Sequence, residues 1–321
     1  MIRRLLVYAV LFCLCTTAAV SFAGGSGAYP NGAEDFMSGA APPPGTYFLF
    51  YSNFYSADRY KDNEGNNYEA GPLADVDINV WANVFRFLHV TDIKILGGNY
   101  AFHTFVPFVN MDFEFGAPFD SFSDTRFGLG DIIVDPFILT WHTKQFHWVA
   151  GLDIFLPTGE YNEEKEPINP GNNVYTFEPV FAVTYLNGPW DVSVKFMYDI
   201  STDNDDYIIT PGEAGAIGNP GLAGQTGSLT PGQEFHFDYA VGYNLSPEWT
   251  VGINGYVYEQ ITDDEIEGIS VNDMKGSVIA VGPAIKYNYR NMSFILKSLW
   301  ETEVENRPAG SSTWLKLVVA F

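Results

Sequence analysis

His236 and Asp238 lie two positions apart in a stretch where polar and apolar residues alternate. In an extended strand such residues share a face, so the imidazole and the carboxylate can form a pair. A His–Asp pair of this kind activates the nucleophile of many acyl-transfer enzymes. The sequence has no G-x-S-x-G motif and no serine that can be placed beside the pair. We therefore predict no enzyme activity and interpret His236 as a residue that lines the interior of a larger structure.

Three other stretches have the composition of ligand sites without the full motif. The stretches 61–66 (KDNEGN) and 201–207 (STDNDDY) contain oxygen ligands suited to Ca²⁺, but not the complete twelve-residue loop. Loosely held divalent cations at a lipopolysaccharide surface are the alternative. The glycine-rich run 211–232 lacks the G-K-[ST] ending of a phosphate-binding loop. We predict no cofactor and no specific metal, and a flexible loop at 211–232 that folds over or into the mouth of the structure.

The elements that carry these residues alternate with a period of two. In 190–200, apolar side chains at even positions oppose mostly polar ones at odd positions, and 235–245 alternates in the same way. A helix would scatter these residues around its axis, so the pattern predicts strands. Twelve such segments are predicted: 46–56, 76–89, 94–110, 127–140, 147–157, 174–186, 190–200, 233–245, 249–260, 276–289, 292–302 and 312–321.

The connections between these strands alternate between long and short. Long polar loops follow the odd-numbered strands, and turns of a few residues, such as those at 187–189 and 290–291, follow the even-numbered ones. This arrangement is typical of an up-and-down meander. A sheet can enter a bilayer only when it is closed, because each unpaired backbone group in hydrocarbon costs several kcal/mol. The sequence predicts an all-β transmembrane antiparallel barrel of about twelve strands, with short periplasmic turns and long extracellular loops.

The last predicted strand, 312–321, fits such a barrel. Every second residue from Leu315 to Phe321 is apolar, whereas Lys316 lies on the opposite face. In a barrel the first face meets lipid and Lys316 meets a wet interior, and this strand pairs with 46–56 to close the sheet. A C-terminal Phe on an alternating strand resembles the terminal signature that the assembly machinery of Gram-negative outer membranes reads. Phe321 is therefore the expected assembly signal.

The first residues indicate export. Arg3 and Arg4 precede an apolar run at 5–14 that is short for a membrane-spanning helix, and a small-residue site follows near Ala23. The expected location is the outer membrane of a Gram-negative bacterium. Three parts are predicted: 1–23, a signal peptide; 24–45, a Gly/Pro-rich lead; and 46–321, the barrel.

The distribution of charged and aromatic residues indicates possible partners of the barrel and the roles of its inner face and its long loops. The formal net charge is −23, which argues against nucleic acid as a partner. Charges of both signs on the predicted inner faces suit either an internal brace or a narrow pore. The candidate lumen-lining residues are Asp135, Asp153, Glu178, Asp191, Lys195, Asp199, His236, Asp238, Lys286, Lys297, Glu301 and Lys316. The long loops hold the candidate aromatic capture residues, Tyr60, Tyr68, Phe119, Phe122, Tyr161 and Tyr207.

One stretch carries a family resemblance. Residues 31–65 read NGAEDFMSGAAPPPGTYFLFYSNFYSADRYKDNEG, in which PPPG enters an aromatic first strand and an acidic Asn/Gly loop follows. This stretch resembles the meta-pathway phenol-degradation family. The resemblance implies an outer-membrane barrel that moves aromatic or other hydrophobic compounds.

These observations lead to one main functional hypothesis. We expect a porin-like channel for passive uptake of small hydrophobic or aromatic molecules, with outer-membrane lipid, lipopolysaccharide and the assembly machinery as partners. The alternative is a closed structural, ligand-binding or adhesin barrel without transport. A barrel enzyme that acts on lipid and a soluble secreted β-protein are the further alternatives.

Overall fold

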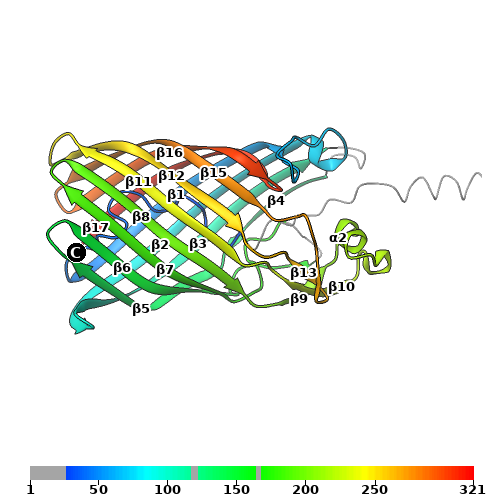
Figure 1. The fold of residues 1–321 in the computed structure, drawn as a ribbon, viewed down its shortest axis with the longest axis horizontal. Coiled ribbons are helices and arrows are strands. Elements are labelled where there is room, and N and C mark those ends of the chain that lie inside the picture. The colour runs from blue at the N-terminus through cyan, green and yellow to red at the C-terminus, as the bar shows by residue number, and fades with distance from the viewer. Residues whose placement is uncertain (1–26, 117–121, 164–167) are drawn as a thin grey trace, which may run out of the picture.

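The computed structural model describes residues 27–116, 122–163 and 168–321, and its main feature is a closed antiparallel barrel (Figure 1). Strand β1 pairs with β17 and with β2, and β2 pairs with β3, so the sheet closes on itself. Strands β4 and β5 pair with successive parts of β3 and share one place in the wall. The predicted twelve-stranded barrel is confirmed. The wall consists of β1 (Gly45–Tyr60), β2 (Val76–Ile95), β3 (Gly98–Phe115), β4 (Phe122–Leu129), β5 (Ile132–His142), β6 (Phe146–Leu156), β7 (Thr176–Asn187), β8 (Trp190–Ser201), β11 (Glu234–Asn244), β12 (Trp249–Gln260), β15 (Ser277–Tyr289), β16 (Met292–Glu305) and β17 (Pro308–Ala320).

The fourth predicted strand, 127–140, is divided in the structure. Gly130 and Asp131 leave the ladder between β4 and β5. The Gly130 N–H donates to the carbonyl of Pro107, and the Asp131 carboxylate accepts N–H groups from Gly159 and Asn172. These bonds to a neighbouring strand and loop replace the ladder bonds and interrupt the wall on the long-loop side.

The last strand has the predicted orientation. Tyr51 of β1 lies opposite Lys316 of β17, which closes the barrel. The exposed fraction is 46% for Leu315 and 84% for Phe321, but 6% for Lys316. Alternate residues of this strand therefore face outward and inward, as a wall between lipid and a filled interior requires.

The outer surface is rich in exposed aromatic residues. Trp141 stacks on Trp148 beside one short turn, and Trp249 contacts Tyr287 beside another. Rings of this kind form the interfacial girdle of membrane barrels. Within the described part of the chain, no helix is both long and apolar enough to cross a bilayer.

Beyond the long-loop end lies a small folded unit, the outer sheet unit, made of residues 204–230 and 265–270 (Figure 1). It has an apolar core around Tyr207, Ile209 and Ile266. The glycine-rich run is thus part of a folded unit rather than the flexible loop expected from its composition, because its apolar residues find partners in the next long loop. The unit contains β9 (Asn204–Ile208), α2 (Pro211–Ala216), η4 (Pro220–Leu222), β10 (Thr226–Thr230), β13 (Glu265–Ile266) and β14 (Ile269–Ser270); a further short helix, η2 (Pro72–Ala74), precedes β2.

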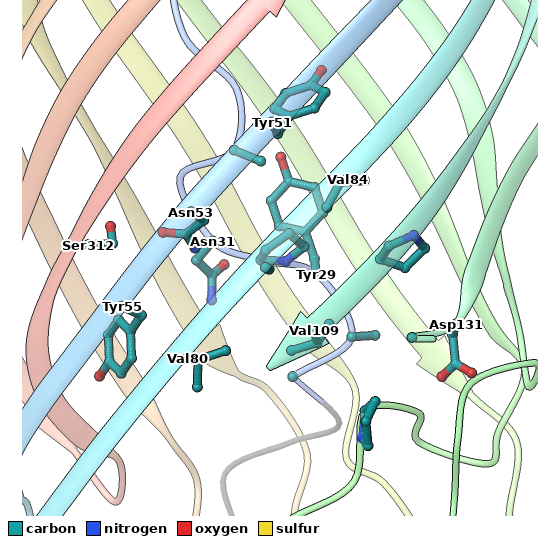
Figure 2. A pocket seen from close by; sticks show the side chains of 18 of the residues that line it. Tyr29, Asn31, Tyr51, Asn53, Tyr55, Val80, Val84, Val109, Asp131 and Ser312 are labelled. Atoms are coloured by element: carbon teal, nitrogen blue, oxygen red, sulfur yellow. The ribbon is translucent and has the colours of Figure 1, made fainter. Parts of the chain in front are cut away.

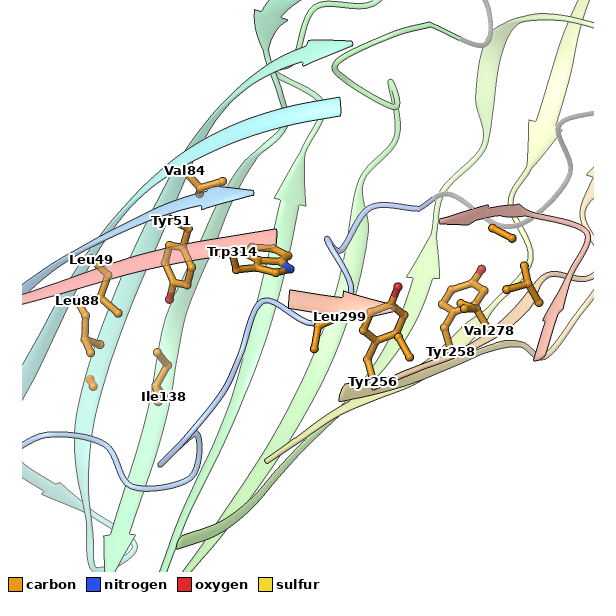
Figure 3. Packing of buried hydrophobic residues seen from close by; sticks show 14 of the residues in the cluster. Leu49, Tyr51, Val84, Leu88, Ile138, Tyr256, Tyr258, Val278, Leu299 and Trp314 are labelled. Atoms are coloured by element: carbon orange, nitrogen blue, oxygen red, sulfur yellow. The ribbon is translucent and has the colours of Figure 1, made fainter. Parts of the chain in front are cut away.

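The barrel interior is filled by side chains rather than left as an open pore. Tyr51, Leu299 and Trp314 belong to a buried apolar cluster contributed mainly by β1, β2, β12 and β15–β17 (Figure 3). Acidic and basic side chains also lie inside the barrel: one group is on β5–β8 and β11, and Arg86, Lys297 and Lys316 are on strands that also carry the apolar cluster.

Candidate functional site: the barrel lumen

The structure places all twelve candidate lumen-lining residues on the inner face of the barrel. Ten of them are buried, and Lys286 and Glu301 are partly buried. Seven form a charged wall across β5–β8 and β11, in which the strand register sets Asp153 opposite Glu178 and Lys195 opposite Asp238. The members of this charged wall are Asp135, Asp153, Glu178, Lys195, Asp199, His236 and Asp238.

The lumen also contains residues 27–44, here called the lumen segment. Its backbone has little regular structure, so its N–H groups need acceptors from the wall. Asp238 accepts hydrogen bonds from the N–H groups of Gly32 and Glu34 and from the Tyr29 hydroxyl, at 2.8–2.9 Å. His236 does not pair with Asp238, because its Nε2 lies 3.3 Å from Asp199 instead.

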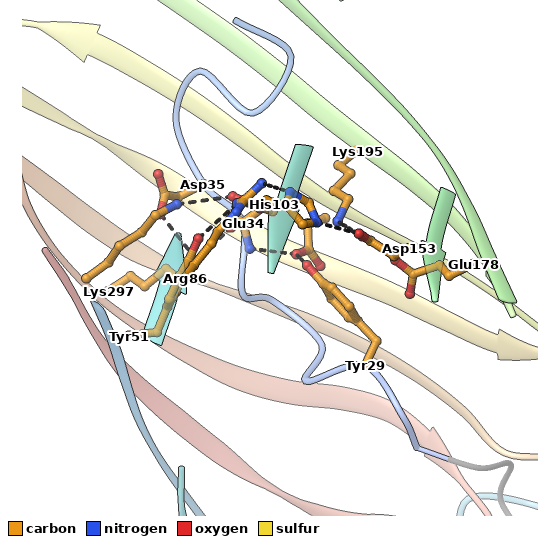
Figure 4. A network of polar contacts seen from close by, with 12 residues as sticks. Tyr29, Glu34, Asp35, Tyr51, Arg86, His103, Asp153, Glu178, Lys195 and Lys297 are labelled. Atoms are coloured by element: carbon orange, nitrogen blue, oxygen red, sulfur yellow. Dashed lines mark hydrogen bonds and ion pairs between the residues drawn. The ribbon is translucent and has the colours of Figure 1, made fainter. Parts of the chain in front are cut away.

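Two acidic residues of the lumen segment meet three wall cations (Figure 4). Glu34 lies 3.0 Å from the guanidinium of Arg86 and 3.1 Å from the Lys316 ammonium. Asp35 lies 3.1 Å from the same ammonium and 3.9 Å from that of Lys297. These side chains are largely shielded from solvent, so each charge depends on its partner.

Residues 37–39 of the lumen segment pack closely against β7 and β8. The N–H of Met37 donates to the Ser193 hydroxyl, and that of Gly39 donates to the Thr184 hydroxyl. A Cβ at position 39 would approach the β7 backbone to 2.6 Å, so only glycine fits there without a shift.

The lumen segment lies between two cavities. The loop-side cavity has a volume of about 460 Å³, and residues 27–31, 33 and 34 contribute to its lining (Figure 2). The turn-side cavity, of about 530 Å³, is lined by residues 35–37 and 40–43 instead. The two cavities share no lining residue, so the lumen segment divides the interior.

The loop-side cavity is mostly apolar. Its wall is formed largely by aromatic and aliphatic side chains of β1–β3 and β17, with Asn31, Asn53 and Asp131 among the polar groups. Glu34, Asp153, Glu301 and Arg307 are its other charged lining residues besides Asp131, and Glu301 accepts hydrogen bonds from two tyrosine hydroxyls. A cavity of this size and lining suits a small apolar ligand. Apolar lining residues include Tyr51, Val80, Val84, Phe105, Val109, Phe155 and Trp314.

Comparison with known proteins assigns the chain to a family. The family described as "Putative MetA-pathway of phenol degradation" matches residues 57–317. The chain belongs to this family. The lumen segment lies before the matched region. No curated protein matches the chain in sequence.

Solved structures show the same fold at low sequence identity. The crystal structure of the COG4313 outer membrane channel from Pseudomonas putida F1 superposes with a TM-score of 0.71 at 16% identity, covering 88% of this chain and 98% of that chain. The transport unit of the autotransporter AIDA-I from Escherichia coli has a TM-score of 0.51 at 8% identity, covering 88% and 92%.

The candidate capture residues of this family member differ in exposure. Tyr60 is buried, and Tyr207 is buried with its hydroxyl donating to Glu213. Tyr68 is partly buried, and Tyr161 binds the backbone of the outer sheet unit at the Asp206 carbonyl. Phe119 lies outside the described residues, as do the predicted signal peptide and its cleavage site, and Phe122 is described only as the first residue of β4.

Several residues that form polar contacts inside the barrel were not predicted from the sequence. The inward direction of Arg86 can be predicted from the sequence, because Arg86 lies two positions after the inward residue Val84 on the same strand. Glu34, Asp35 and Tyr29 carried no such signal, since the lead has no strand period.

Proposed function

We propose that the protein is an outer-membrane channel for passive uptake of small hydrophobic or aromatic molecules. The observation that carries the proposal is the apolar loop-side cavity of about 460 Å³ inside a closed barrel. Membership in a phenol-degradation family and the fold shared with an outer-membrane channel support it. A solute descends its gradient, so the protein supplies a route and no chemistry.

The route begins at the long-loop end. Tyr68 and Tyr161 are the capture residues best placed for first contact, because Tyr60, at the end of β1, and Tyr207, in the outer sheet unit, are buried. The solute then enters the loop-side cavity, where rings and branched aliphatic side chains replace water. Passage to the turn-side cavity requires the lumen segment to shift, because no lining residue joins the two cavities. The acidic loops disfavour anions.

Uptake into vesicles tests this route. Val80 lines the loop-side cavity from β2 (Figure 2), and Asn83 lies on the other face of the same strand. In vesicles with lipopolysaccharide in the outer leaflet, wild-type protein should speed the entry of phenol relative to a monosaccharide. Val80→Trp fills the cavity and should reduce phenol entry several-fold, whereas Asn83→Trp should leave it unchanged.

A closed ligand-binding or adhesin barrel is the second candidate, and the division of the lumen by its segment favours it. Wild-type vesicles that take up phenol no faster than empty ones, with ligand still bound in the cavity, would establish this alternative. Signal-peptide cleavage near Ala23, contact with lipopolysaccharide and assembly through Phe321 stay predictions from the sequence.

A further inference from the structure

The charged wall, together with His103 of the neighbouring strand β3, contains two clusters with the same composition, one histidine and two carboxylates each. The first consists of His103, Asp135 and Asp153, and the second of Glu178, Asp199 and His236. In each cluster the possible ligand atoms lie within 4.8 Å of one another, and all six residues are buried. Their hydrogen bonding distinguishes them.

In the first cluster, both nitrogens of the histidine are engaged. Arg86 can only donate, so its Nη2, 2.9 Å from His103 Nδ1, makes that nitrogen an acceptor. The proton of the imidazole then lies on Nε2, which donates to Asp153 at 2.6 Å. The histidine of this cluster thus has a partner on each nitrogen, and the one atom of the cluster without a partner among the described residues is Asp135 Oδ2.

In the second cluster, ligand atoms are left over. Among the described residues, neither carboxylate oxygen of Glu178 has a hydrogen-bond partner, and the same holds for Oδ1 of Asp199 and Nδ1 of His236. The exposed fraction of these residues is 0%, 1% and 1%. A buried polar atom without a partner destabilises the folded state, so a group of such atoms favours an occupant that pairs with them.

The spacing of the second cluster suits a metal ion. His236 Nε2 lies 3.3 Å from Asp199 Oδ2 and 3.6 Å from Glu178 Oε2. Metal–ligand bonds of about 2.0–2.2 Å in a tetrahedral site place neighbouring ligand atoms about 3.3–3.6 Å apart. An ion held at these spacings binds Nε2 and Oδ2 in place of their mutual hydrogen bond and gives Glu178 Oε2 the partner that it lacks among the described residues.

The local charge also favours a dication. Lys195 lies 3.6 Å from Asp153 and 3.9 Å from Glu178, and Asp199 is the third carboxylate of the group. Lys195 is therefore shared between the two clusters, and among the described residues no lysine or arginine forms an ion pair with Asp199. Burying charge without compensation is expensive, and one divalent cation balances it.

We propose that Glu178, Asp199 and His236 form a buried site for a divalent transition-metal ion of the Zn²⁺ type. The nitrogen and two carboxylate donors fit Zn²⁺ better than Ca²⁺, which prefers six or more oxygens. The site joins β7, β8 and β11 directly behind Tyr29, whose ring centroid lies 4.9 Å from that of His236. The ion links these three strands in the part of the charged wall that contacts the lumen segment.

Metal binding to the purified full-length barrel in detergent tests the proposal. After EDTA treatment, wild-type protein should take up one tightly held equivalent of Zn²⁺, measured by calorimetry and by elemental analysis after gel filtration. Co²⁺ should give the visible absorption of a tetrahedral site. Both Glu178→Gln and Asp199→Asn should lose the tight equivalent and the Co²⁺ spectrum.

Asp135→Asn is the matched control, because Asp135 is an equally buried carboxylate in the first cluster, whose histidine already has a partner on each nitrogen. It should keep the tight equivalent, while weak binding to the acidic loops stays the same in every variant. Folding of each variant is checked by heat-modifiable migration in gels, and His236→Gln replaces any variant that fails to fold. Wild-type protein without a tight equivalent, or site variants that retain it, would overturn the proposal and leave shared protons as the occupants.

Discussion

The lumen segment and the outer sheet unit are both glycine-containing regions outside the barrel wall, but different kinds of contact stabilise them. The outer sheet unit pairs its own strands and buries Ile209 and Ile266 in its own core. The lumen segment forms no ladder, and its backbone bonds go to wall side chains such as Asp238 and Ser193. Apolar residues let a loop fold on its own outside the barrel, whereas a segment that carries paired acids depends on a charged wall.

This contrast predicts that the lumen segment detaches when its charges are removed. Glu34→Gln takes the ionic partner from Arg86 and one of two from Lys316. Breaking a buried ion pair from one side costs about 3 kcal/mol or more, which corresponds to a roughly hundredfold larger population of the displaced state. Single-channel recordings should show frequent large openings that wild-type protein lacks.

Glu64→Gln is the matched control, because Glu64 is an exposed loop residue that also carries one negative charge. It should leave the recordings unchanged. If Glu34→Gln behaves like the control, the ion pairs do not hold the lumen segment, and the contrast with the outer sheet unit fails.

The sequence predicts the wall well and its contents poorly. Alternation along β8 and β11 gives the inward direction of Lys195 and Asp238, because a strand has only two faces. The structure places both there. Glu34 and Asp35 precede the first strand, have no period to orient them, and find a partner such as Lys316 about as far away in sequence as the chain allows.

The glycine-rich run, 211–232, is a second region whose structure the sequence predicts poorly. Its composition predicts flexibility, but its own Ala214 is buried in the same core as Ile266 of another long loop, and its Leu229 pairs with Ile266. Glycine content indicates how many conformations the backbone can adopt. The fold of the run depends instead on contacts with residues far away in the sequence, which a single sequence does not show.

The outer sheet unit should unfold without affecting the barrel. Ile266→Ala removes a fully buried side chain and should cost about 2–4 kcal/mol within the unit, enough to expose its loops to protease. Ile269→Ala, at an exposed position of the same sheet, should not. Limited proteolysis measures the first effect, and heat-modifiable migration should show an unchanged barrel. A change in conductance with Ile266→Ala would show instead that the unit covers the lumen.

The smallest effect should come from Tyr29→Phe, which removes a single hydroxyl from the lumen segment. Asp238 loses one of three hydrogen-bond donors and keeps the N–H groups of Gly32 and Glu34, while the ring still packs on His236. A hydrogen bond to a charged group contributes about 1.5 kcal/mol, so brief openings should become roughly tenfold more frequent. Tyr100→Phe, whose hydroxyl donates to the Pro136 carbonyl of the barrel wall at an exposed position, should have no effect on openings. Openings as frequent as those of Glu34→Gln would mean that Asp238, rather than the ion pairs, dominates the hold on the lumen segment.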